Sequence, residues 1–238
     1  MDQSIDDAPA RETGREASQP KQSAPHRHAY DDGAKPLGPF LTGYRLLVGF
    51  YVVGELVLIA QSILLYQEAR RFQAGSEPGD ALTYFAWAGL ALYLLPFLAC
   101  AYFVCRFTYR ANRNLYSVAP KTVTHHPGWA VGSYFLPIAN LFVPAQAMSE
   151  IYHGTYKMTG EESRANSPIS IWWGAWLVSF CASQISGSIG TYTLFTTVLD
   201  GLSCLTGIVA ALSLLGIMQR IEVRQRSFRH GPLADVFD

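Results

Sequence analysis

Long apolar blocks, separated by short polar segments, constrain the fold of this chain more than any other feature. A helix needs roughly 20 apolar residues to cross the hydrocarbon core of a bilayer. Four blocks meet this requirement and are expected as clear transmembrane helices: residues 46–66, 82–104, 169–187 and 201–218. Pro96 lies inside the second block, where neighbouring helices can accommodate a kink. The sequence therefore predicts an all-α membrane protein.

A fifth apolar block, residues 129–148, contains two helix breakers. Pro137 and Pro144 each remove a backbone donor and clash with the preceding turn, and Asn140 lies between them. We expect one short helix over residues 128–136 and a second helix that begins at Pro144. The block is thus predicted to be a broken helical element that either re-enters the same side of the membrane or crosses it with a kink.

The distribution of basic residues distinguishes these two topologies. Lys and Arg concentrate on the cytoplasmic side of membrane proteins. If all five blocks cross, the basic residues divide almost equally between the two sides. If the broken element returns to the side from which it came, nearly all of them share one side with both termini. This pattern predicts four full spans plus a re-entrant element in the cell (inner or plasma) membrane, with cytoplasmic N- and C-termini.

The two ends of the chain differ in composition from the apolar blocks. Residues 1–41 are rich in small, polar and acidic residues, which bury too little apolar surface to offset the entropy of ordering. We therefore expect a disordered cytoplasmic tail over 1–41, a helical membrane domain over 42–226 and a flexible tail over 227–238. Because this polar segment precedes the first apolar block, no cleavable signal peptide is expected, and the first span should remain as an anchor.

Charge, cysteine and motif content argue against several classes of function. The 18 basic and 18 acidic residues give zero formal charge, so no global field favours nucleic acid. The four cysteines fall in apolar blocks without a C-x-x-C pair and are expected as buried free thiols. Glu150 and His153 form a single Glu-x-x-His pair, whereas di-iron bundles need two. No phosphate loop or catalytic triad motif is present either, so we expect no metal, cofactor or catalytic residue.

Glu55 is the ionisable residue nearest the middle of a predicted span. A charge at that depth is costly, so the side chain must find a partner inside the bundle or stay protonated. It is either a proton- or cation-linked site or a neutral carboxyl hydrogen-bonded to another helix. Glu55, Asn140, Pro137 and Pro144 together form the candidate polar membrane site. Asp200 is expected to be a helix cap at the membrane surface.

The segment after the second span carries basic residues at helical spacing. Arg106, Arg110 and Arg113 share one helix face and, with Asn114, are candidate contacts for anionic lipid headgroups or an acidic ligand. The alternative is a solvated helix end. Asn112 and Asn114 can also hydrogen-bond the broken element.

Small residues recur every four positions in the third and fourth spans. They are Ser179, Ser183 and Gly187 in one, and Ser203, Gly207 and Ala211 in the other. Such stripes let helix backbones approach closely in lipid. We therefore expect these two spans to pair as a tight hairpin.

Three segments carry a resemblance to a known family. They are "YRANRNL" (109–115), "PGWAVGSYFLPIANLFVPAQAMSEI" (127–151) and "MQRIEVRQ" (218–225). Together they resemble an uncharacterised bacterial membrane family, domain of unknown function 4328, over most of residues 42–226. The Pro-x-x-Asn-Leu-x-x-Pro element is the most specific part, whereas Ser133 departs from the aromatic residue usual there and affects packing beside the motif. The family has no assigned activity, so the resemblance implies a group and not a mechanism.

Two functions are consistent with these sequence features. The first is a multi-pass membrane protein acting as an interaction or envelope-associated component. Its partners would be the lipid bilayer, anionic headgroups, a second copy or another membrane protein. The second is a small transporter or channel for an ion or small solute, using Glu55 and the broken helix around Asn140. An intramembrane enzyme is least supported, because a nucleophile or metal set is lacking.

Overall fold

The computed structural model describes residues 34–74, 80–161 and 167–229. Within these ranges the chain is helical, without strands. Its long helices are α1 (Gly38–Gln73), α2 (Asp80–Val118), α5 (Ser167–Ile189) and α6 (Leu194–Gln225). The shorter ones are α3 (Pro127–Gly132) and α4 (Val143–Met158), with the 3-10 turns η2 (Pro120–Thr122), η3 (Ser133–Phe135), η4 (Ala139–Leu141) and η5 (Ser227–Arg229).

Three of the four predicted spans are long and apolar enough to cross a membrane. They are α1, residues 87–118 of α2, and α6. The prediction of four clear spans is therefore not supported, since α5 falls outside this group. Three tryptophans, several serines and Gln184 lower the mean hydropathy of α5. Pro96 lies inside α2, and the helix continues through it.

The helix ends differ from the predicted boundaries for local reasons. α1 begins at Gly38 with Pro39 in its first turn, eight residues before the predicted span. α6 begins at Leu194 because Thr193 and Thr196 form a reciprocal capping box. Asp200 consequently lies inside α6, and its prediction as a helix cap is wrong. Most of the two predicted tails lies outside the described residues, although 38–41 belong to α1 and 227–229 form η5.

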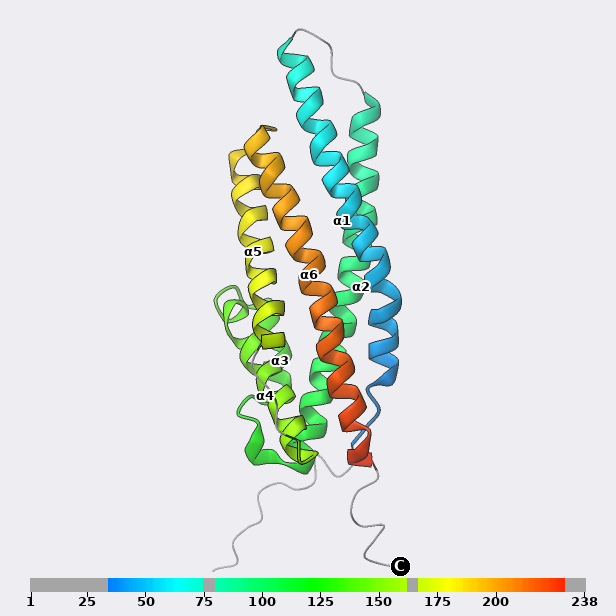
Figure 1. Ribbon diagram of the computed structural model, residues 1–238, viewed down its shortest axis with the longest axis vertical. Coiled ribbons are helices and arrows are strands. Elements are labelled where there is room, and N and C mark those ends of the chain that lie inside the picture. Colours follow the sequence, from blue (N-terminus) through cyan, green and yellow to red (C-terminus); the bar gives the residue numbers. More distant parts are fainter. Residues whose placement is uncertain (1–33, 75–79, 162–166, 230–238) are drawn as a thin grey trace, which may run out of the picture. The chain divides into compact units, whose positions relative to one another are not determined.

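The long helices pack side by side, with α1 along α2 and α6, and α5 along α6 (Figure 1). The small-residue hairpin of α5 and α6 is present as predicted. Ser203 Oγ donates to the carbonyl of Ser179 at 2.9 Å, and Ser186 Oγ donates to that of Thr196 at 3.4 Å. Gly54 likewise allows α1 and α2 to approach closely, since a Cβ there would lie 2.9 Å from the carbonyl oxygen of Leu92.

The buried core is concentrated where α3 and α4 join the bundle, beside the C-terminal half of α6 (Figure 1). Fully buried side chains there include Phe107, Leu115, Met148, Ile151 and Ile221. Toward the other end, the long helices expose many large apolar side chains instead. This distribution is expected of a bundle whose outer surface faces lipid rather than water.

The fifth apolar block is broken as predicted. α3 continues into η3, the chain bends at Pro137, and η4 leads into α4, which has Pro144 in its first turn. Both arms of this element lie at the same end of the bundle, because Glu150 of α4 accepts hydrogen bonds from the backbone amides of Thr124 and His125 at 2.9 and 3.1 Å. The element is therefore a hairpin with a closed base.

The depth of the hairpin follows from its contacts. Its tip is held by Trp173 of α5, whose Nε1 donates to the carbonyl of Leu141 at 3.2 Å. The hydrogen bonds of Ser203 with Ser179 and of Ser186 with Thr196 set the antiparallel register of α5 against α6. In this register Trp173 lies level with Val209. Near the base, Glu161 binds Arg224 at 2.7 Å. The hairpin is therefore about 22 Å deep, which is the distance along α6 from residue 209 to residue 224 at 1.5 Å per residue.

Candidate functional site

Glu55 lies in a buried polar cluster between α1, α2 and α6. Its side chain is only 4 % exposed. The hydroxyl of Tyr51, one turn earlier, donates to Glu55 Oε1, and the thiol of Cys204 on α6 also contacts the carboxyl. Neither partner is cationic. The carboxyl therefore joins α1 to α6 by hydrogen bonds rather than by an ion pair.

Gly207 makes room for this cluster. A Cβ at Gly207 would lie 2.9 Å from Glu55 Oε1, 3.0 Å from the Tyr51 hydroxyl and 3.3 Å from Ser179 Oγ. Such distances are shorter than ordinary van der Waals contact, so α6 can approach α1 this closely only because the residue is glycine. On the α2 side, the Tyr51 ring packs against that of Tyr93 with centroids 5.8 Å apart.

A second carboxyl lies between α1 and α6, nearer the α5–α6 turn. Asp200 accepts a hydrogen bond from Ser62 Oγ at 2.6 Å. The adjacent Gln61 is 5 % exposed and donates to the carbonyl of Phe85 on α2 at 2.5 Å. Glu55 is thus part of a longer series of polar contacts along α1, which the sequence analysis did not predict.

The structure does not bring Glu55 and Asn140 together. Asn140 lies in η4 at the tip of the hairpin, where its backbone amide donates to the carbonyl of Leu136 at 2.7 Å. Pro137 forms the bend before η4, and Pro144 starts α4. Three of the four residues of the candidate polar site therefore shape the hairpin, and Glu55 belongs to a separate cluster.

Glu150 and His125 close the base of the hairpin. Glu150 Oε1 lies 2.9 Å from His125 Nδ1, and Oε2 accepts from two backbone amides. Burial opposes ionisation of this carboxyl, but the hydrogen bonds from His125 and Thr124 outweigh it and hold the pKa of Glu150 below its usual range. Asn112 Nδ2 donates to the carbonyl of His125 at 3.2 Å, just before the broken element.

Asn114, predicted as a lipid or ligand contact, is buried and ties four elements together. Its amide exchanges two hydrogen bonds with the backbone of Lys35, at 2.9 and 2.8 Å, and donates to Gln225 at 3.1 Å. Gln225 in turn donates to Thr155 on α4 at 3.0 Å and to the carbonyl of Ala111 at 3.2 Å. This network fastens the start of α1 to α2, α4 and α6.

The three predicted basic contacts on α2 differ in their surroundings. Arg106 is exposed, and its guanidinium lies 5.6 Å from the centroid of the Phe40 ring at the start of α1. Arg110 and Arg113 are half-buried. Arg106 is therefore the member of this group that faces the surroundings most openly.

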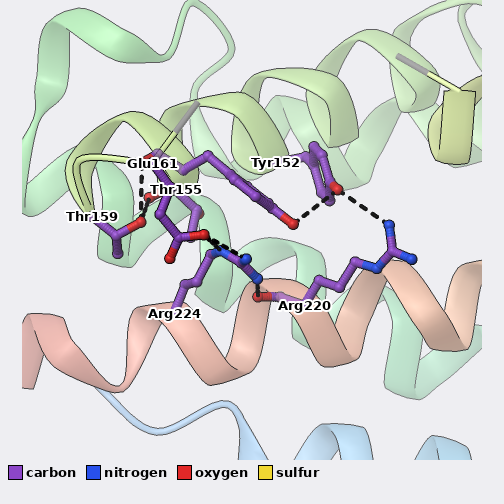
Figure 2. A network of polar contacts seen from close by, with 7 residues as sticks. Tyr152, Thr155, Thr159, Glu161, Arg220 and Arg224 are labelled. Atoms are coloured by element: carbon purple, nitrogen blue, oxygen red, sulfur yellow. Dashed lines mark hydrogen bonds and ion pairs between the residues drawn. The ribbon is translucent and has the colours of Figure 1, made fainter. Parts of the chain in front are cut away.

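A cluster of tyrosines and arginines joins α4 to the end of α6 (Figure 2). Arg220 donates to the Tyr152 hydroxyl at 3.5 Å, and Tyr152 donates to the Tyr156 hydroxyl at 3.1 Å. The guanidinium of Arg224 lies 3.7 Å from the centroid of the Tyr156 ring and binds Glu161. This cluster was not predicted from the sequence, although Tyr152 and Tyr156 are four residues apart and thus share a helix face.

The tip of the hairpin exposes large apolar side chains. Ile138 is 80 % exposed, Phe135 76 % and Phe142 59 %. These three residues, which we call the hairpin tip, stand on a backbone that is not α-helical over 133–142. At the same time the hairpin is anchored at its base by Glu150 and near its tip by Trp173.

A comparison with known families identifies the group to which this architecture belongs. The model of the family described as Domain of unknown function (DUF4328) matches residues 77–222. The chain belongs to the DUF4328 family. The match confirms the resemblance seen in the sequence and includes the whole hairpin and all of α5. α1, with Glu55, lies before the matched region of this DUF4328 protein. No curated protein and no solved structure matches the chain.

Proposed function

We propose that this DUF4328 protein is a multi-pass membrane protein that binds another membrane protein through the hairpin tip. The observation that carries the proposal is the exposure of Phe135, Ile138 and Phe142 on irregular backbone, about level with the middle of α6. Lipid-exposed irregular backbone does not occur within the hydrocarbon region, because lipid cannot hydrogen-bond its peptide groups. A protein surface must therefore cover this part of the hairpin.

The topology that accompanies this proposal has α5 as the fourth span and the hairpin as a re-entrant element. α5 pairs with α6 along small residues, a mode of helix association typical of membranes. Described basic side chains other than Arg70 and Arg71 lie in the half of the bundle that holds the hairpin. By the positive-inside rule this half is cytoplasmic, so the start of α1 and the end of α6 face the cytoplasm.

The partner we favour is a transmembrane helix of another protein. The three side chains of the tip offer aromatic and branched apolar surface, and the polar side chains of Glu55 and Asn114 already have hydrogen-bond partners within the bundle. Van der Waals packing of an apolar helix against such a surface is the usual basis of association in lipid. A second copy of this chain is the alternative occupant.

Site-specific photo-crosslinking in native membranes tests this proposal. A photoreactive amino acid at Ile138 should yield a crosslink to a protein, whereas the same group at Leu95 should crosslink lipid. Leu95 is a matched control because it is 67 % exposed and lies on the regular helix α2. Crosslinking of position 138 to lipid alone would show that the tip is not covered by protein and would refute the proposal.

A second function, transport of a proton or small cation, is favoured by one specific observation. Glu55 is an ionisable group in the middle of α1, with Asp200 nearby on the same helix interface. Proton flux into liposomes containing the purified protein tests this function. Flux above the level of empty vesicles that is lost in Glu55→Gln would support it, and flux equal to empty vesicles for the unmodified protein would refute it.

A further inference from the structure

The cluster of tyrosines and arginines between α4 and α6 has more hydrogen-bond donors than acceptors. Arg224 is engaged at all three of its nitrogens, because Nε and NH2 bind Glu161 at 3.2 and 2.7 Å and NH1 donates to the carbonyl of Arg220 at 3.2 Å. Arg220 is exposed and uses one nitrogen, which donates to Tyr152. Because a guanidinium group has five N–H donors, most of the donors of Arg220 remain available to a ligand.

The two phenols extend this donor surface. The Tyr152 hydroxyl donates a hydrogen bond to the Tyr156 hydroxyl at 3.1 Å and accepts one from Arg220. Burial raises the pKa of Tyr156, so its phenol keeps its proton near neutral pH. The Tyr156 hydroxyl therefore has a proton to donate. Figure 2 shows these groups along one side of the α4–α6 contact, with Arg220 at one end and Arg224 at the other.

The net charge of the cluster also favours an anionic ligand. Arg220 and Arg224 contribute two positive charges, and Glu161 compensates one of them. Because Arg224 is held by both the carboxylate and the Tyr156 ring, the uncompensated charge belongs to Arg220. A guanidinium fork with an excess charge is suited to bidentate binding of a phosphate or carboxylate.

The position of the cluster indicates where its ligand lies. Arg220 comes two residues after Met218, the last residue of the predicted apolar span, and Val223 on the next turn is 61 % exposed. The guanidinium thus stands where the apolar surface of α6 gives way to polar residues. In a membrane this is the level of lipid phosphates, which attract basic side chains.

We propose that Arg220, positioned by Tyr152 and Tyr156, binds the phosphate of an anionic phospholipid headgroup. Tyr152 orients the guanidinium fork by accepting one N–H, and Tyr156 stiffens Tyr152 through the hydroxyl contact and through ring packing at 4.7 Å between centroids. Arg224 and Glu161 fix Tyr156 from the other side. The site goes beyond the proposed function, since it lies at the base of the bundle and not at the hairpin tip.

Native mass spectrometry of the purified full chain tests the site. The probes are phosphatidylglycerol and phosphatidylcholine, added in equal amounts to the detergent-solubilised protein. The wild type should retain phosphatidylglycerol in preference. Arg220→Lys keeps the charge but loses the planar fork and its fixed orientation, so retention should fall about tenfold, as for loss of a charged hydrogen bond. Tyr152→Phe should cause a loss in the same direction, because it removes the acceptor that orients the fork.

Arg226→Gln is the matched control. Arg226 lies on the same side of the membrane, is 69 % exposed in its side chain and pairs with Glu222 rather than with the tyrosines. Its replacement should leave retention near the wild-type level. An equal loss in Arg226→Gln, or unchanged retention in Arg220→Lys, would show general surface attraction and overturn the proposal.

A second arm distinguishes the lipid from a free anion. Inorganic phosphate in millimolar excess should not displace phosphatidylglycerol, because the lipid also buries acyl chains against α6. Displacement by phosphate would identify a site for a soluble anion and overturn the assignment to lipid. The unfolding midpoint of Arg220→Lys, measured in the same detergent, should match the wild type, since Arg220 is exposed. A large drop would mean that the cluster holds the fold and does not bind lipid.

Discussion

Gly207→Ala probes the contact between α6 and the Glu55 cluster directly. The added methyl group would lie 2.9 Å from Glu55 Oε1, 3.0 Å from the Tyr51 hydroxyl and 3.3 Å from Ser179 Oγ. The Tyr51 hydroxyl and Glu55 Oε1 are hydrogen-bonded to each other and buried, so neither of these two oxygens can move away without breaking that bond. Overpacking of this kind typically destabilises by about 1–3 kcal/mol. We therefore expect Gly207→Ala to lower the stability of the bundle by an amount in that range.

The matched control is Gly216→Ala, about two and a half turns along the same helix. A Cβ at Gly216 would meet no atom within 4 Å. Alanine there should raise stability slightly, by up to about 1 kcal/mol, because glycine is the poorer helix former. The assay is unfolding of the purified protein in detergent, followed by tryptophan fluorescence. The five tryptophans of the described helices report on packing around α2, α3 and α5.

A double-mutant cycle identifies the atom responsible. If the methyl group clashes with the carboxylate, Glu55→Ala in the Gly207→Ala background should restore part of the loss, giving a coupling energy of about 1 kcal/mol. Equal stability of Gly207→Ala and Gly216→Ala would refute the close approach of α6 to Glu55. Additive effects of the two substitutions would refute the assignment of the clash to the carboxyl.

Three further predictions follow from the polar contacts. Asn114→Ala should lower stability by about 1–3 kcal/mol in the same unfolding assay, because it removes the partner of the Lys35 backbone amide and of Gln225 Oε1, while Asn140→Ala should have a clearly smaller effect; equal effects would contradict the network. Glu150→Gln should be less stable than wild type at neutral pH, and since the folded pKa is depressed this difference should vanish as the pH falls through that folded pKa, below the usual Glu range; a difference independent of pH would contradict it. Trp173→Phe should remove about 1 kcal/mol and speed hydrogen exchange in residues 136–142, and unchanged exchange there would show that the bond to Leu141 does not hold the tip.

Helical periodicity and proline chemistry explain what could be predicted from the sequence. The break at Pro137 and the helix start at Pro144 follow from the missing backbone donors, which act locally. The α5–α6 hairpin followed from small residues at a fixed spacing. The hydrogen bond between Tyr51 and Glu55 was also within reach, because residues four apart share a helix face.

Contacts between distant residues account for what the sequence did not reveal. Glu150 pairs with His125 rather than acting with His153, and Asn114 binds the backbone of Lys35, a contact that spans 79 residues. Arg220 meets Tyr152 only because α4 folds back along α6. None of these pairs leaves a periodic signal. The start of α6 was misplaced for a different reason, since the predicted span began where the apolar block begins, after Asp200, whereas a capping box of two threonines starts the helix at Leu194.

Accessibility of cysteines at positions 121 and 157 tests the central claim, that the broken element is a hairpin which enters and leaves by one side. The two positions flank the hairpin, and Arg71→Cys reports on the opposite end of the bundle. In intact cells and inverted vesicles, with Cys181 replaced by alanine, a membrane-impermeant maleimide is added to one side at a time. We predict that Lys121→Cys and Lys157→Cys react only from the cytoplasmic side and Arg71→Cys only from the other. Labelling of positions 121 and 157 from opposite sides would contradict the account.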